Sequence, residues 1–273
     1  MSYSPLNFVP SHKKRFIRGC TIIFGVGLMV FSVMKSNSSE NQTLWIVDNS
    51  LSMTVEDMPS SSGIIDSRLN LAKKIIKNGS TLLNEKQAIM SVAYWAKLEV
   101  PMTDDLWILS DVTSGINPII RWGGSTISTP LEMIRIVYGD LPNLRIFWLT
   151  DGEFSDSGST YSGKLDTSRI TFIGLGSRSG WPIPMGYDSD GKPKYKEVEN
   201  KRITSIRDDA SLNMVAKMLG AKVVFLDSEK NIDLSFIIDN SVSFEKNISI
   251  YIFIGWLFIA IWLMIPRYNY FFK

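Results

Sequence analysis

Two long apolar runs near the ends of the chain restrict any water-soluble fold to the residues between them. The first run extends from Phe16 to Met34 and carries one charge, Arg18, near its start. The second run, Ile248 to Ile265, contains no charged residue. A helix needs about 20 apolar residues to cross the hydrocarbon core of a bilayer. Each run therefore predicts a transmembrane helix, with a soluble domain between them.

The basic residues around these runs predict the orientation of the chain. They lie at the outer ends of both runs: Lys13, Lys14, Arg15, Arg18, Arg267 and Lys273. Lysine and arginine stay on the cytoplasmic side of membrane proteins, so both termini are predicted inside and the central region outside. The first run also fits a cleaved signal peptide, but no A-x-A-like cleavage site follows Met34, and an uncleaved anchor is favoured.

The composition excludes several classes of function. The 29 basic and 27 acidic residues are mixed along the chain and give a net charge of +2, so no field that would attract nucleic acid is expected. The single cysteine, Cys20, and the single histidine, His12, exclude a disulfide framework, a thiolate zinc site and a histidine-dependent catalytic triad in the body of the protein.

Between the two runs, apolar β-rich segments alternate with segments of helical period, which is typical of an α/β domain with a mainly parallel sheet. We expect strands at 43–48, 87–96, 144–152 and 169–177, helices at 67–83, 104–116 and 129–139, and a final helix and strand within 210–227. From Gly180 to Arg202 the sequence is rich in Gly, Pro, Asp and Lys and has no period, which predicts a surface insertion.

Oxygen-bearing side chains follow several of these strands. They come from three loops: Asp48, Ser50 and Ser52 in WIVDNSLSM, Ser125 and Thr126 in GGSTISTPL, and Asp151 in LTDG. Ligands of open α/β folds bind at the carboxyl edge of the sheet, and such oxygens suit Mg²⁺ or Mn²⁺. The first loop alone is more typical of a turn or a helix cap. The three loops together predict one cation site.

These residues resemble a known family. DNSLS is similar to the D-x-S-x-S of the metal-ion-dependent adhesion site in von Willebrand factor A (VWA) domains, and the other two loops match the same site. In that family the metal is held by the aspartate and both serines, by a hydroxyl of the middle loop and by the aspartate of T-D-G, commonly through water. The resemblance implies five ligands here: Asp48, Ser50, Ser52, Ser125 and Asp151.

The middle loop departs from the family pattern. The family usually has threonine where this chain has Ser125, and Thr126 is the alternative ligand if the alignment slips by one residue. Serine retains the hydroxyl that binds the metal. The resemblance implies Mg²⁺ as the ion, with Mn²⁺ or Ca²⁺ as alternatives.

Four further runs resemble the bacterial aerotolerance (Bat) subgroup of membrane-bound VWA domains. They are TVEDMP (54–59), DSRLNLAKKII (66–76), VPMTDD (100–105) and GWPIPMGYDSDGKPKY (180–195). The resemblance covers about Leu44 to Leu226 and implies a Rossmann-like VWA fold, a central mainly parallel sheet flanked by helices, with a transmembrane helix on each side. Bat proteins often have two spans before the domain, whereas this chain shows one.

The expected organisation follows from both lines of reasoning. It comprises a cytoplasmic tail (1–15), a span (16–34), a linker (35–43), a VWA domain (44–228) with an insertion (180–203), an amphipathic connector (229–247), a second span (248–265) and a second cytoplasmic tail (266–273). The resemblance implies the bacterial inner membrane as location, with the domain outside the cytoplasm. It also implies, as partners, other VWA membrane proteins and a MoxR-type AAA+ ATPase.

The sequence favours adhesion over catalysis. In the favoured interpretation, an acidic residue of a partner protein completes the shell of the bound metal. A scaffold that positions partners without metal is the first alternative. A phosphotransferase with Asp48 as nucleophile is the second, but Ser50 stands where such an enzyme needs its second carboxylate for acid–base chemistry. No enzymatic activity is therefore expected.

The tryptophans are expected to serve mainly the core. Trp45, Trp95, Trp107 and Trp148 lie in predicted strands and helices, where packing is the usual role of so large an apolar ring. Trp122 and Trp181 lie on the Gly-rich loop and the insertion, and are better candidates for surface contacts.

Overall fold

The structure is a computed structural model that describes residues 41–60, 63–83, 85–120, 124–139, 141, 143–156 and 166–228. These residues belong to one compact unit, Glu40–Ser241. Both predicted spans, both tails and the connector 229–247 lie outside the described residues, so the predicted domain organisation stays a prediction. Within the described ranges, no helix combines the length and the apolar character needed to cross a bilayer.

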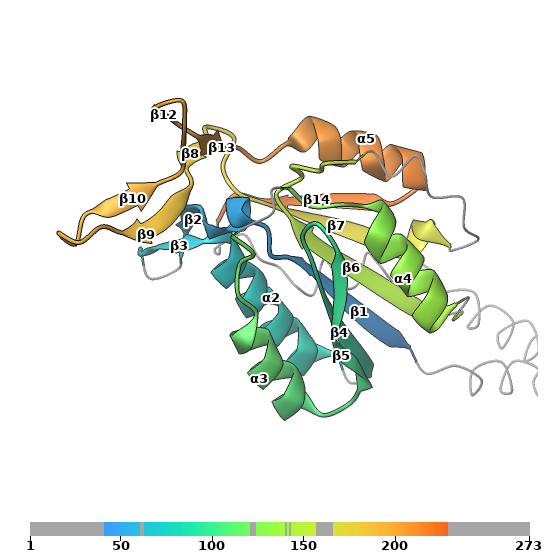
Figure 1. The fold of residues 1–273 in the computed structure, drawn as a ribbon. Coiled ribbons are helices and arrows are strands. Elements are labelled where there is room, and N and C mark those ends of the chain that lie inside the picture. Colours follow the sequence, from blue (N-terminus) through green and yellow to red (C-terminus); the bar gives the residue numbers. More distant parts are fainter. Residues whose placement is uncertain are drawn as a thin grey trace, which may run out of the picture. The chain divides into compact units, whose positions relative to one another are not determined.

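A six-stranded sheet forms the centre of the domain (Figure 1), with the strand order β14-β7-β6-β1-β4-β5. The strands are β1 (Gln42–Asp48), β4 (Lys86–Val92), β5 (Ala96–Thr103), β6 (Leu144–Thr150), β7 (Ile170–Leu175) and β14 (Lys222–Leu226). Every neighbouring pair is parallel except β4 and β5, which form an antiparallel hairpin. The predicted α/β class with a mainly parallel sheet is confirmed.

The hairpin corrects the prediction of one strand over 87–96. The first strand ends at Val92, the chain turns over 93–95, and β5 returns along the sheet edge. Most β5 side chains are partly or fully exposed, and Pro101 lies within the strand. Proline and exposed polar residues are typical of an edge strand. β5 therefore lacks the continuous apolar run that indicates a buried strand in the sequence.

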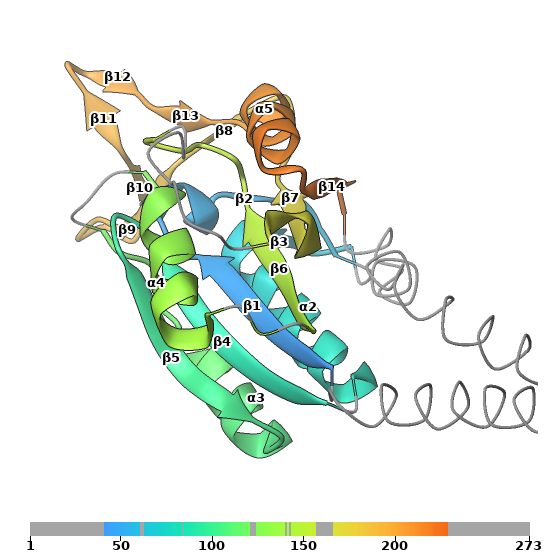
Figure 2. The same cartoon turned by 90° about the vertical axis from the view of Figure 1, so that its right-hand side faces the viewer.

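Helices cover both faces of the sheet (Figure 2). They are α2 (Arg68–Leu82), α3 (Leu106–Gly115), α4 (Ser128–Tyr138) and α5 (Asp209–Leu219). Side chains of α2 and α3 share one core cluster with Trp45 and Val47 of β1, whereas α4 and α5 share the other with Leu44 and Ile46. Successive side chains of a strand point to opposite faces. The central strand therefore supplies both cores, which explains its nearly continuous apolar sequence.

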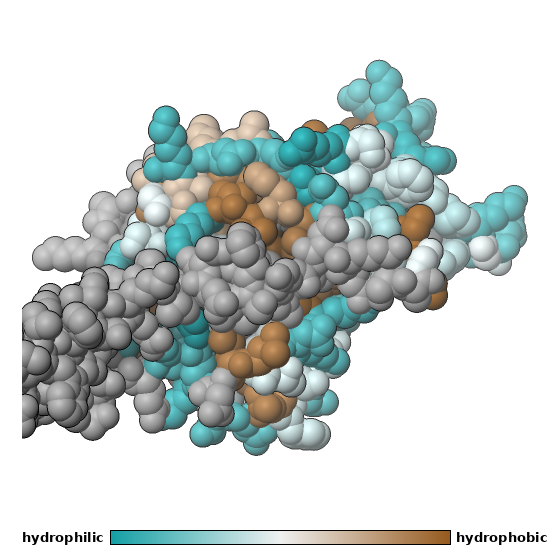
Figure 3. Space-filling view, turned by 180° about the vertical axis from the view of Figure 1, so that it is seen from behind, coloured by the Kyte–Doolittle hydropathy of each residue, from teal (hydrophilic) through white to brown (hydrophobic). Residues whose placement is uncertain are grey.

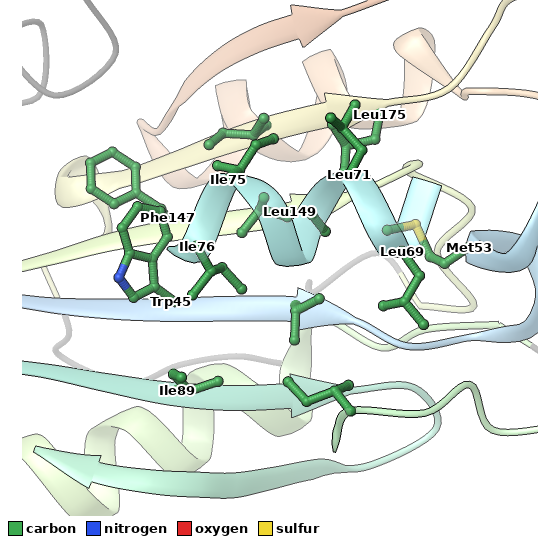
Figure 4. Packing of buried hydrophobic residues seen from close by; sticks show 14 of the residues in the cluster. Trp45, Met53, Leu69, Leu71, Ile75, Ile76, Ile89, Phe147, Leu149 and Leu175 are labelled. Atoms are coloured by element: carbon green, nitrogen blue, oxygen red, sulfur yellow. The ribbon is translucent and has the colours of Figure 1, made fainter. Parts of the chain in front are cut away.

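The core beneath α2 is built around an aromatic pair (Figure 4). Trp45 stacks on Phe147 with ring centroids 4.9 Å apart, and Ile75 and Ile76 of α2 pack in the same cluster. The indole Nε1 of Trp45 donates to Oε1 of Gln87 over 2.8 Å. Gln87 in turn donates to two carbonyls at the end of α2, those of Ser80 and Leu83. The indole N–H of Trp45 and the side-chain amide of Gln87 are therefore satisfied.

Short elements lie beside the carboxyl edge of the sheet. These are η1 (Leu51–Thr54), β2 (Glu56–Pro59) and β3 (Ile65–Ser67), and, in the segment expected to be an insertion, β8 (Trp181–Pro182), β9 (Pro184–Tyr187), β10 (Pro193–Tyr195), β11 (Glu197–Val198) and β12 (Lys201–Arg202). Directly after that segment, β13 (Thr204–Ser205) pairs with β8. The remaining short element, η2 (Thr167–Arg169), precedes β7. Ile183 packs with Leu51 and Val55 in a small apolar cluster. The insertion is thus attached to the segment that follows β1.

The tryptophan predictions hold only in part. Trp45 and Trp148 are buried, but Trp107 is 73% exposed and Trp95 is 51% exposed. Trp95 lies in the turn between β4 and β5. Trp107 precedes the buried Leu109 of α3 by two residues, which places it on the opposite side of the helix. Trp122 lies outside the described residues, and Trp181 is exposed as expected.

Part of the remaining apolar surface is visible from behind, where brown patches alternate with hydrophilic residues (Figure 3). The exposed apolar side chains of the domain come from several separate elements, including β3, α3, α4 and the insertion. Scattered apolar residues are normal on protein surfaces. The fold itself therefore does not identify one dominant apolar face.

The contact between α2 and Trp45 generates a stability prediction. A Cβ on Gly79 would lie 2.6 Å from Cη2 of Trp45, and the ring is held by Phe147 and Gln87. We expect Gly79→Ala to lower the free energy of unfolding by about 1–3 kcal/mol, because overpacking outweighs the gain in helix propensity. Urea denaturation measures the change.

Gly115 at the end of α3 is the matched control, because a Cβ there meets nothing within 4 Å. Gly115→Ala should be neutral or stabilise the protein by up to about 1 kcal/mol. Equal effects of the two substitutions would contradict the packing described here.

Candidate metal centre

The pairing of β1 with β6 brings the two candidate aspartates to one edge of the sheet. Val47 is the register partner of Leu149, so Asp48, the last residue of β1, and Asp151, the residue after β6, lie at the ends of neighbouring parallel strands. The middle loop joins them, because Ser125 forms a β-bridge with Phe154 and its carbonyl accepts a hydrogen bond from the Ser155 amide over 2.7 Å. The structure thus brings together the three loops that carry the predicted ligands.

The predicted ligands are almost completely shielded from solvent. Asp48, Ser125 and Asp151 are 0% exposed, Ser50 is 2% exposed and Ser52 is 6% exposed. A buried polar group is costly unless it is hydrogen-bonded or paired. The partners of these five side chains therefore decide what the site can do.

Asp48 accepts hydrogen bonds on both carboxylate oxygens. The Ser50 amide donates to Oδ1 over 2.9 Å, and Thr150 Oγ1 donates to Oδ2 over 2.7 Å. The first bond closes the turn that the sequence alone also allowed. The hydroxyls of Ser50 and Ser52 are 3.0 Å apart, with Oγ atoms in hydrogen-bond contact. The first loop is therefore ordered around its carboxylate.

Burial and, after it, the negative charge of Asp151 raise the pKa of Asp48 to about 6. The hydrogen bonds from Ser50 and Thr150 oppose this shift, because they stabilise the ionised form. Within the described residues, no basic side chain forms an ion pair with Asp48. The carboxylate is thus charged at neutral pH at a free-energy cost.

The two hydroxyls of the middle loop differ in their surroundings. Ser125 Oγ is buried and has no hydrogen-bond partner among the residues that the structure describes. Thr126 Oγ1 donates to the Tyr94 carbonyl over 3.3 Å and shares a short hydrogen bond with Thr129. A buried hydroxyl without a partner, on a loop that is bridged to the segment after Asp151, is a side chain that a cation would satisfy.

Arg68 is a site residue that the sequence reasoning missed. It is the first residue of α2, and its side chain is 0% exposed. It donates to both oxygens of Asp57, from Nε over 3.0 Å and from Nη2 over 2.7 Å, and to Asp151 Oδ2 from Nη1 over 2.9 Å. Ser205 of β13, the strand that pairs with β8 of the insertion, accepts from Arg68 through its hydroxyl and its carbonyl. Arg68 therefore connects the metal edge to the insertion.

A signal for Arg68 was present in the sequence. Leu71, Ala72, Ile75 and Ile76 form the buried stripe of α2, and residue 68 precedes them at helical spacing. A charged residue on an apolar stripe indicates a buried ion pair. The spacing could not identify the partners, because Asp151 is 83 positions away along the chain.

Glu153 completes the surroundings of Asp151. Its amide donates to Asp151 Oδ1 over 3.2 Å, and its carboxylate accepts from the Ile206 amide over 3.1 Å. Burial and the charge of Asp151 raise the pKa of Glu153. Among the described residues, no three or more His, Cys, Asp and Glu side chains form a metal cluster. The candidate site instead combines two carboxylates with hydroxyls.

A mostly parallel sheet flanked by helices, with oxygen side chains at its carboxyl edge, has the Rossmann-like fold of VWA domains. The solved structure of BatB from Bacteroides thetaiotaomicron matches with a TM-score of 0.58 and 20% identity, over 74% of this chain and 97% of that chain. An aerotolerance-related membrane protein from Bacteroides fragilis matches with a TM-score of 0.60 and 21% identity, over 74% of this chain and 98% of that chain. The predicted Bat resemblance is confirmed at the level of the fold.

Two other comparisons gave no match. No protein-family model matches the chain, and no curated protein matches it.

The raised pKa of Asp48 generates a pH prediction for the full chain in detergent with EDTA. An acid whose pKa is higher in the folded protein than in the unfolded chain stabilises the fold at pH values below its unfolded pKa, here 3.8. This stabilisation is lost as the pH rises through the folded pKa of about 6. Asp48→Asn should therefore match the wild type near pH 4 and be more stable at pH 7, by up to about 3 kcal/mol. Thermal unfolding at both pH values tests this. A less stable variant at pH 7 would overturn the assignment.

Proposed function

We propose that this chain is a membrane-anchored VWA protein of the Bat type whose domain binds a divalent cation and uses it to hold a partner protein. Mg²⁺ is the first candidate, with Mn²⁺ and Ca²⁺ as alternatives. The observation that carries the proposal is that, among the described residues, the buried hydroxyl of Ser125 has no hydrogen-bond partner and Asp48 has no basic partner. Hard oxygen donors of this kind are those that Mg²⁺ prefers.

The five predicted side chains have distinct roles in this proposal. Asp48 and Asp151 supply negative charge, and Ser50, Ser52 and Ser125 supply neutral oxygen donors. The cation, when bound, supplies positive charge that offsets the burial of Asp48 and offers a coordination position to a carboxylate. The hydrogen bonds of Asp48 with Ser50 and Thr150 hold its oxygens in position in advance. Such preorganisation lowers the cost of binding.

The partner in this proposal is a protein that presents an acidic side chain. Other VWA membrane proteins and a MoxR-type AAA+ ATPase are the candidates that the Bat resemblance suggests. The B. fragilis protein of similar fold is described as a membrane protein, which supports a membrane location for this chain. The apolar runs and flanking basic residues support the inner membrane, with the domain outside the cytoplasm. We propose no enzymatic activity.

A scaffold that works without metal is the second candidate. Arg68 favours it, because its guanidinium already neutralises part of the charge of Asp151 over 2.9 Å. Asp48 counts against it, because this carboxylate stays buried and without an ion pair in the described part of the chain. Cation binding decides between the two.

Ser125→Ala separates cation binding from structural effects. In EDTA the variant should be as stable as the wild type or more stable, because an unsatisfied buried hydroxyl is removed. Its affinity for Mg²⁺ should fall about tenfold or more, since a ligand is lost and each 1.4 kcal/mol corresponds to a factor of ten. Isothermal titration calorimetry of the full chain in detergent measures the affinity.

Thr126→Val is the matched control, because Thr126 Oγ1 is already engaged by Tyr94 and Thr129. It should leave Mg²⁺ affinity unchanged. A loss of affinity in Thr126→Val and not in Ser125→Ala would assign the ligand to Thr126. Absence of Mg²⁺ binding by the wild type would exclude the metal hypothesis.

Partner binding should depend on the cation. In native membranes, chemical crosslinking followed by mass spectrometry should yield partner crosslinks from the domain that EDTA removes and Mg²⁺ restores. Asp48→Ala should lose the same crosslinks, whereas Thr126→Val should keep them. Crosslinks that persist in EDTA and in Asp48→Ala would support the metal-independent scaffold.

A further inference from the structure

Arg68 and Asp57 form a buried ion pair directly beside the candidate cation site. Their side chains are 0% and 3% exposed, and the guanidinium meets the carboxylate through two hydrogen bonds of 3.0 and 2.7 Å. Neither residue is among the predicted ligands. Arg68 also contacts the ligand Asp151. The pair therefore belongs to the electrostatic surroundings of the cation without occupying its shell.

The surroundings hold both residues in place. Gly176 lies against the guanidinium at a φ of +118°, where a Cβ would be 2.5 Å from Nε of Arg68. The Ser177 amide donates to Asp57 Oδ2 over 2.8 Å, and Ser205 accepts from Arg68. The guanidinium is therefore held by hydrogen bonds to Asp57, Asp151 and Ser205 at once. Its charge is thus a permanent part of the site.

The buried charges of this cluster do not cancel. Asp48, Asp57 and Asp151 contribute three negative charges when ionised, and Arg68 contributes one positive charge. The sum is −2, which a divalent cation balances. Glu153 is only partly buried, so solvent screens its charge more than theirs.

We propose that Arg68 and Asp57 set the net charge of the cation site and thereby its preference for divalent over trivalent cations. This inference rests on the proposed function, because it assumes that the site binds a cation. The attraction of a cation to its surroundings scales with the charge of the cation. One unit of site charge therefore changes the affinity for a trivalent ion more than the affinity for a divalent ion.

Charge-changing variants of the full chain in detergent test the proposal. Arg68→Gln makes the cluster −3, Asp57→Asn makes it −1, and the double variant restores −2. The readout is the ratio of Tb³⁺ to Mg²⁺ affinity from isothermal titration calorimetry. A general loss of structure would not change this ratio in opposite directions in the two single variants. We expect the ratio to rise about tenfold in Arg68→Gln, fall about tenfold in Asp57→Asn and return to the wild-type value in the double variant.

Arg68→Lys is a further control, because it keeps the charge and loses the paired hydrogen bonds to Asp57. It should lower stability and leave the ratio unchanged. If Arg68→Gln fails to fold, Asp57→Asn and the double variant still test the inference. Both carry asparagine at position 57 and therefore leave no uncompensated aspartate there. A ratio that stays constant across the variants would overturn this inference while leaving cation binding intact. A wild type that binds neither ion would instead overturn the proposed function.

Discussion

The ion-pair cluster of Arg68 is the interaction on which the carboxyl edge of the sheet depends. One guanidinium connects the start of α2, the aspartate after β6, the strand β2 and the strand β13. Burying a charge is costly, and removing one member of a buried ion pair leaves the other uncompensated. Asp151 and Ser205 lie 83 and 137 positions from Arg68 along the chain, so their positions relative to α2 depend on contacts that only the folded chain provides.

The two-sided core explains why this edge is well ordered. β1 is buried on both faces, with Trp45 and Val47 toward α2 and Leu44 and Ile46 toward α4 and α5. Its parallel neighbours β4 and β6 fix its register on both sides. Asp48 is the last residue of this strand. A carboxylate held by so constrained a strand cannot move to solvent, which is why its charge remains costly in the absence of a cation.

The site therefore combines carboxylates that are paired with a guanidinium and polar groups that have no such pairing in the described residues. Arg68 satisfies Asp57 and one oxygen of Asp151, whereas Asp48 and Ser125 have no such partner in the described residues. Destabilised groups concentrate at functional sites because the fold is stabilised elsewhere. Here the stabilisation comes from the two apolar cores and from the insertion, whose Ile183 packs against Leu51 and Val55 next to the ligand loop.

The sequence by itself determined the fold class and the ligand candidates. Apolar runs marked the buried strands, helical spacing marked α2 and α4, and D-x-S-x-S, the Gly-rich loop and T-D-G marked three ligand loops, because these patterns are local. Tertiary structure decided what depends on distant contacts. It showed the antiparallel edge strand β5, the exposure of Trp107, and the difference between the unpaired hydroxyl of Ser125 and the engaged hydroxyl of Thr126. Arg68 lay on a visible helical stripe, but its partner Asp151 could be identified only after folding, since electrostatic pairing depends on distance in space.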